Sequence, residues 1–119
     1  MNREELEIRT KQFSIEVVRF ISSLPQNKIT DVLGYQVLKS ATSIGANYRE
    51  ANRAESRSDF IHKIGIVEKE AAETQYWLEL FNELSIGDLD KRMKLLDECS
   101  QLLAIFTRTG KSTKMNKPK

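Results

Sequence analysis

Apolar residues recur along this chain at spacings of three and four, the period that places side chains on one face of an α-helix. Four segments show the pattern, and they predict helices over residues 2–23, 31–54, 58–84 and 88–108. Three short connections between long helices are typical of antiparallel neighbours. The pattern therefore predicts an all-α protein that folds as an antiparallel up-and-down four-helix bundle.

Each predicted helix carries an apolar stripe that would face the core. The stripes of the first two helices are Leu6, Phe13, Val17, Phe20, Ile21 and Leu24, and Leu33, Val37, Ala41, Ile44, Tyr48 and Ala51. Those of the last two are Phe60, Ile64, Val67, Ala71, Thr74, Leu78 and Phe81, and Leu89, Met93, Leu96, Leu103 and Phe106. The third stripe alternates four and three apart over three heptads, which is the seam of a left-handed bundle.

Local signals predict where the helices begin and end. Pro25 ends the first helix, because the residue before a proline is pushed out of the α region. Thr30 and Asp31 are the predicted N-cap pair of the second helix, and Ser56 or Ser58 is the predicted N-cap of the third. Gly87 supplies the turn before the fourth helix.

Gly110 is expected to end the fourth helix and to divide the chain into a bundle, residues 1–109, and a basic disordered tail, residues 110–119. The tail holds four lysines and no acidic residue, and the remaining residues hold 15 basic and 17 acidic side chains. The formal net charge of +2 therefore combines a slightly acidic body with a basic tail. This balance is not that of a strongly basic nucleic-acid-binding domain, although it does not exclude nucleic acid.

Two helices have more apolar residues than one core-facing stripe requires. The additional positions are Ile8, Ile15 and Val18 in the first helix, and Ile66, Trp77, Leu80 and Leu84 in the third. Scattered apolar residues are normal on protein surfaces. Aligned stripes more often mark a partner surface, so we expect a homo-oligomer with Trp77 as an anchor of its interface.

Few residues are suited to catalysis or metal binding. Glu70 and Glu73 share a helix face, but di-iron bundles use a Glu-x-x-His pair from each of two helices, and His62 is the sole histidine. The single cysteine, Cys99, excludes an intrachain disulfide and is expected to be a small core residue. We therefore expect no catalytic residue, no metal site and no cofactor.

The cysteine content and the apolar segments of the sequence also indicate the cellular compartment. One unpaired cysteine favours a reducing compartment. The charged start of the chain has no apolar segment of signal-peptide type, and no apolar run has the length of a membrane span. We expect a cytoplasmic protein.

A polar strip flanks the apolar stripe of the second helix. Its members, together with two carboxylates of the third helix, are Ser40, Ser43, Asn47, Glu50, Glu70 and Glu73. Small hydroxyl groups allow a neighbouring helix to approach closely, and Asn47 and Glu50 could pair with the third helix across the groove. A helix-packing strip is the favoured interpretation, and a ligand-binding strip is the alternative.

Arginines spaced four apart suggest a contact with nucleic acid. Arg49, Arg53 and Arg57 would form a ladder on the solvent-facing side of the second helix, a pattern that can follow a phosphate backbone. With Lys111, Lys114 and Lys117 of the tail, they are the candidate nucleic-acid contacts. A solvated charged face is the alternative, because acidic residues alternate with the arginines.

Residues 40–51, 58–64 and 68–78, with the Leu24-Pro25 pair before them, resemble the four-helix-bundle family of 23S rRNA-intervening-sequence proteins. The resemblance implies a ring-like homopentamer and a bacterial reading frame of the kind found in insertions within 23S rRNA genes. Related bundles, the accessory variability proteins of diversity-generating retroelements, are basic pentamers associated with a reverse transcriptase and nucleic acid. The polar strip carries over as structural or interface positions, and no catalytic residue comes with it.

Two functions follow as expectations. The first is a non-enzymatic, homopentameric bundle that binds ribosomal or other structured RNA, or a nucleic-acid-associated protein. The second is a protein–protein interaction scaffold with no role in nucleic-acid binding. Neither expectation involves a membrane.

Overall fold

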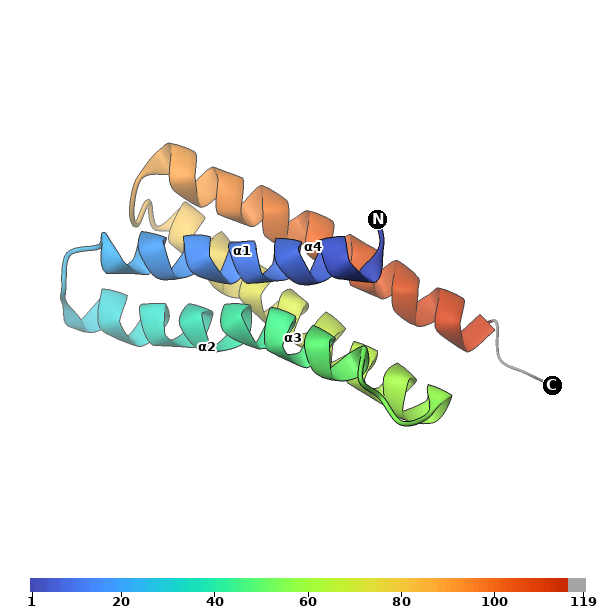
Figure 1. Cartoon of the computed structure of the whole chain (residues 1–119). Coiled ribbons are helices and arrows are strands. Elements are labelled where there is room, and N and C mark those ends of the chain that lie inside the picture. Colours follow the sequence, from blue (N-terminus) through green and yellow to red (C-terminus); the bar gives the residue numbers. More distant parts are fainter. Residues whose placement is uncertain (116–119) are drawn as a thin grey trace.

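The computed structural model describes residues 1–115, which form an all-α, antiparallel four-helix bundle (Figure 1). The helices are α1, Arg3–Ser22; α2, Lys28–Ala51; α3, Arg57–Glu83; and α4, Leu89–Met115. Each helix packs against the next one along the chain, and α1 also packs against α4. No helix in the described part is long and apolar enough to cross a membrane.

The core confirms the stripes that were predicted for the first three helices. Phe13, Val17 and Phe20 of α1 are buried together with Val37 and Ile44 of α2, as is the α3 seam from Ile64 to Phe81. Two aromatic pairs connect helices across the core, one between α1 and α3 and one between α2 and α4. The rings of Phe20 and Phe81 lie 6.0 Å apart, and those of Tyr48 and Phe106 lie 5.2 Å apart.

For α4, the predicted stripe is confirmed at Phe106, which is fully buried, and in part at Leu96 and Leu103, which pack against the core, but it was wrong at the start of the helix. Its buried row is Arg92, Leu95, Cys99, Leu102, Phe106 and Gly110. Leu89 and Met93 are instead 60% and 46% exposed. The doublets Leu95-Leu96 and Leu102-Leu103 fit either of two adjacent faces. The buried face is the one that contains Arg92. The spacing of apolar residues alone does not favour this face, because it holds a charged residue.

The prediction that Gly110 ends the fourth helix and starts a disordered tail was also wrong as far as the structure reaches. Gly110 is buried inside α4, which continues to Met115. A Cβ at Gly110 would lie 3.4 Å from Glu68 Oε1 and 3.7 Å from a methyl group of Ile64. This glycine therefore permits close packing of α4 on α3. Lys117 and the rest of residues 116–119 lie outside the described residues.

The caps explain the other boundaries. Asn27, rather than Thr30, is the N-cap of α2. Its side chain accepts a hydrogen bond from the Thr30 backbone N–H, and the Thr30 hydroxyl accepts one from the Asn27 backbone N–H, which completes a capping box. Ser56 caps α3 as predicted. Gly87 lies in the α3–α4 turn with φ of +87°, a conformation that favours glycine.

Candidate interaction surfaces

The arginines of the predicted ladder do not share one helix. Arg49 lies in the last turn of α2, Arg53 in the connecting turn, and Arg57 is the first residue of α3. A single-helix ladder would require α2 to reach residue 57, beyond even the predicted end at 54, but the helix ends at Ala51. All three side chains are nevertheless exposed at the same end of the bundle.

The C-terminal lysines join the arginines at that end. The guanidinium of Arg57 donates a hydrogen bond to the backbone carbonyl oxygen of Thr113, in the last turns of α4. A cation at this position stabilises the carbonyl groups that a helix C-terminus leaves unpaired. The contact places Lys111 and Lys114, both exposed, beside the start of α3.

Arg3 and Arg108 extend the same surface, and the sequence reasoning had missed them. Both line a shallow hollow of about 500 Å³ between the start of α1 and the end of α4. They were missed because they come from helices that periodicity alone does not place together. We call the whole set the basic end: Arg3, Arg49, Arg53, Arg57, Arg108, Lys111 and Lys114.

Acidic residues neutralise only part of the basic end. A carboxylate oxygen of Glu7 lies 3.7 Å from Nε of Arg49, and the other accepts a hydrogen bond from Asn52. Among residues 1–115, Arg3, Arg53, Arg108, Lys111 and Lys114 form no ion pair. Their cationic groups are therefore available to an external anion.

Within the described residues, Ser40 is the one member of the polar strip whose side chain forms a hydrogen bond to another helix. The hydroxyl groups of Ser40 and Thr74 form a buried hydrogen bond of 2.9 Å between α2 and α3. The Asn47 amide donates to the Ser43 carbonyl within α2, so within the described chain the predicted pairing of Asn47 across the groove is not formed. Glu50 is exposed and Glu70 is half-buried. Glu73 accepts a hydrogen bond from the Trp77 indole on α3.

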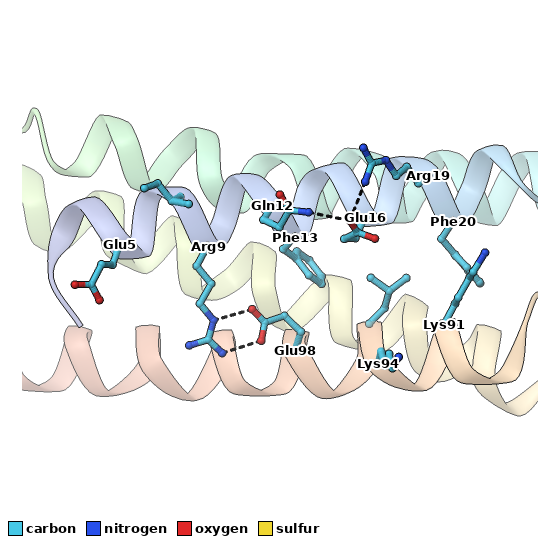
Figure 2. Close-up of a pocket in the computed structure, with 12 residues that line it drawn as sticks. Glu5, Arg9, Gln12, Phe13, Glu16, Arg19, Phe20, Lys91, Lys94 and Glu98 are labelled. Carbon is cyan, nitrogen blue, oxygen red and sulfur yellow. Dashed lines mark hydrogen bonds and ion pairs between the residues drawn. The ribbon is translucent and has the colours of Figure 1, made fainter.

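A groove runs between α1 and α4 (Figure 2). Its volume is about 590 Å³, and its floor consists of Phe13 and Phe20 from α1 and Leu95 from α4. These three side chains are buried in the core below, with only their outer edges facing the groove. A volume of this size is within the range of about 300–1,000 Å³ that ligand-binding clefts have.

Charged residues form the rim of the groove. Arg9 bridges the helices through two hydrogen bonds of 2.7 Å from its guanidinium to the Glu98 carboxylate, which raise the pKa of Arg9 (Figure 2). Toward the start of α4 the rim carries Arg19, Lys91 and Lys94. Arg19 pairs with Glu16 at 3.2 Å and Lys94 pairs with Asp90 at 3.1 Å, so among the described residues Lys91 is the cation of this half that forms no ion pair.

The residues predicted for an oligomer interface occupy different surfaces. Ile8 is 61% exposed and lines the groove, whereas Val18 is exposed elsewhere on α1, and Ile15 is half-buried. On α3, Ile66, Trp77 and Leu80 are half-buried and Leu84 is 57% exposed. No single face contains the whole set.

Similarity to known proteins agrees with this fold. The family model for the 23S rRNA-intervening sequence protein matches residues 4–108. The chain belongs to this family. A solved structure with a TM-score of 0.84 is a protein of unknown function from the S23 ribosomal protein family of Bacteroides thetaiotaomicron. It is 32% identical, and the match covers 93% of this chain and 99% of that one. None of the curated proteins matches the chain.

The 23S rRNA-intervening sequence family match ends just before the last turns of α4, so Lys111 and Lys114 lie beyond it. The described residues contain no group of three or more histidine, cysteine, aspartate or glutamate side chains that could hold a metal ion. Burial raises the pKa of the Cys99 thiol to about 12, and its Sγ contacts the Ala71 carbonyl at 3.4 Å. Cys99 is thus a core residue, as its sequence position predicted.

Proposed function

We propose that this chain forms a non-enzymatic, cytoplasmic homo-oligomer that binds RNA or a ribonucleoprotein through the basic end of each subunit. The oligomer would be a closed ring, with five subunits as the family resemblance implies. The observation that carries the proposal is the contact between Arg57 and the end of α4, because it joins two separately predicted groups of cations. A ring would repeat that surface once per subunit.

The basic end favours recognition of the phosphate backbone over recognition of bases. Its cations are arginine and lysine side chains, which neutralise phosphates independently of sequence. Tyr48 lines the hollow there, but it is buried against Phe106 and its ring cannot stack on a base. We therefore expect binding that depends on the shape and charge of the RNA more than on its sequence.

A charge-reversal variant at the basic end tests this proposal. Arg53→Glu combined with Lys111→Glu removes two exposed cations that form no ion pair within the described chain. Fluorescence anisotropy with a labelled 23S rRNA hairpin should show affinity that falls steeply between about 50 and 200 mM salt. The variant should bind about tenfold more weakly or worse, with a smaller salt slope by about two.

Lys11→Glu combined with Lys39→Glu is the matched control. Both lysines are exposed, the change in net charge is the same, and neither residue belongs to the basic end. This control should keep most of the wild-type affinity. Equal losses in the two variants would mean that net charge alone drives binding, and affinity that ignores salt would contradict a phosphate interface.

The α1–α4 groove supports an alternative function, a protein–protein interaction scaffold. Its apolar floor and charged rim have the composition of a protein-binding surface. Affinity capture after nuclease treatment distinguishes the two functions. Recovery of one stoichiometric partner protein would favour the scaffold, and recovery of RNA alone from an untreated extract would favour RNA binding.

A further inference from the structure

The shallow hollow at the basic end has an apolar floor and cations on its rim. Leu6 of α1, Tyr48 of α2 and Ile105 of α4 line it, and all three are buried or half-buried. Arg3 precedes Leu6 by one helical turn, and Arg108 follows Ile105 by one turn. Because α1 and α4 are antiparallel, both exposed arginines lie toward the same end of the bundle, beyond the apolar floor (Figure 1).

The charges around the hollow are unpaired, unlike most of those around the groove. Within the described part of the chain, no carboxylate lines the hollow. Arg3 and Arg108 form no ion pair with any described residue. In the groove, by contrast, Arg9, Arg19 and Lys94 each pair with a carboxylate. A ligand that suits the hollow therefore joins a negative charge to an apolar part.

Tyr48 gives the hollow a hydroxyl group without a partner. The residue is only 4% exposed and its ring packs on that of Phe106, yet its hydroxyl group forms no hydrogen bond to another described residue. The oxygen is not enclosed by protein, because the fully buried side-chain atoms without a partner in the described chain belong to Asn52 and Arg92. A polar group in this setting is satisfied by whatever occupies the hollow, water or ligand.

A nucleotide has the chemistry that the hollow fits. Its base is flat with apolar faces, and its phosphate groups carry negative charge beside the sugar. The volume of the hollow, about 500 Å³, is within the range of about 300–1,000 Å³ that ligand-binding clefts have. A base stacked inside a duplex cannot enter such a hollow, whereas a base in a bulge or loop can turn out of the helix and pack on an arginine side chain.

We propose that the hollow receives one unpaired nucleotide of a bound RNA, with its base on the apolar floor and its phosphates beside Arg3 and Arg108. This inference rests on the RNA binding in the proposed function and specifies which RNA structure the basic end selects. The Tyr48 hydroxyl meets the edge of the base. Because a hydroxyl group both donates and accepts, and the floor is apolar, the hollow accepts any of the four bases.

Three RNA ligands test the inference with the whole chain. The first is a blunt-ended duplex, the second is the same duplex with one bulged uridine, and the third carries an abasic residue in the bulge. In fluorescence anisotropy at fixed salt, the protein should bind the uridine bulge about tenfold more tightly than the paired duplex, which is the effect of one packed base. The abasic bulge should bind like the paired duplex, because it offers the same backbone without a base.

Tyr48→Phe assigns that preference to the hollow. It removes only the hydroxyl group and leaves the ring against Phe106, so circular dichroism should show an unchanged fold. Affinity for the uridine bulge should fall about threefold to tenfold, and affinity for the paired duplex should not change. Tyr35→Phe is the matched control, because Tyr35 is 61% exposed near the start of α2, at the opposite end of the bundle. The control should change neither affinity.

The Arg53→Glu, Lys111→Glu variant separates this inference from the proposed function. Neither residue lines the hollow, so the variant should weaken binding of both duplexes and keep the ratio between their affinities. Equal, salt-dependent affinities of the wild-type protein for the paired and bulged duplexes would exclude the nucleotide site and leave RNA binding intact. A protein that binds no RNA would remove both the inference and the proposed RNA binding.

Three further results would overturn the inference. If the abasic bulge binds as tightly as the uridine bulge, the protein selects a flexible backbone and not a base. A bulge preference that Tyr48→Phe leaves unchanged would place the nucleotide elsewhere. Binding of adenosine monophosphate at micromolar concentration, without a preference for bulged RNA, would make the hollow a site for free nucleotides.

Discussion

Replacing Phe106 with alanine is expected to lower the free energy of unfolding by about 3–5 kcal/mol. Phe106 is fully buried on α4 and its ring lies 5.2 Å from that of Tyr48 on α2. The substitution removes the largest side chain of the α4 buried row and leaves a cavity at the centre of the bundle. It also removes the aromatic contact between α2 and α4, two helices that do not pack side by side.

Urea unfolding at fixed protein concentration measures the effect, since concentration changes the apparent stability of an oligomer. Leu103→Ala is the control on the same helix. Because Leu103 is half-buried, its replacement by alanine should lower the free energy of unfolding by only about 1–2 kcal/mol. Equal losses for the two variants would contradict the packing of α4, in which Phe106 is fully buried and Leu103 is only half-buried.

Substituting alanine for Gly87 should destabilise the protein by about 2–5 kcal/mol. Gly87 has φ of +87°, where an L-residue is strained. A Cβ there would lie 2.5 Å from Cζ of Phe20 and 3.0 Å from Cδ2 of Leu24. Phe20 is buried against Phe81 and cannot move without disturbing the end of the core.

Gly65→Ala provides a control of opposite sign. Gly65 lies in the middle of α3, is exposed, and a Cβ there would meet no atom within 4 Å. Alanine should therefore stabilise the protein by about 0.5–1 kcal/mol, because glycine loses more backbone entropy in a helix. Thermal unfolding of both variants tests the pair. A Gly87→Ala protein as stable as wild type would mean that the α3–α4 turn does not pack on Phe20.

Periodicity predicted the fold and most of the core, because three of the four helices have one face that is clearly more apolar than the others. The α3 seam from Ile64 to Phe81 is the clearest case. In α4 the leucine doublets made two faces equally apolar. Packing against α3 decides which face is buried. Gly110 contributes to it by allowing α3 to approach closely, and this role cannot be recognised from the sequence of α4 alone.

The surfaces were harder to predict than the core. Helical spacing suggested a ladder from Arg49 to Arg57, but the turn after Ala51 breaks it. Arg57 and Thr113 are 56 residues apart in sequence, so no local sequence pattern predicts their contact. The groove likewise is lined by residues of both α1 and α4, so it is a feature of tertiary packing that no single helix encodes.

The mass of the wild-type protein in solution tests the central claim most directly. Self-assembly through surfaces left uncovered in the subunit predicts a mass several times 13.7 kDa at micromolar concentration, measured by sedimentation equilibrium. A mass of 13.7 kDa that persists as concentration rises would contradict it, since exposed apolar residues such as Ile8 in the groove and Leu84 at the end of α3 would then face water in the native state.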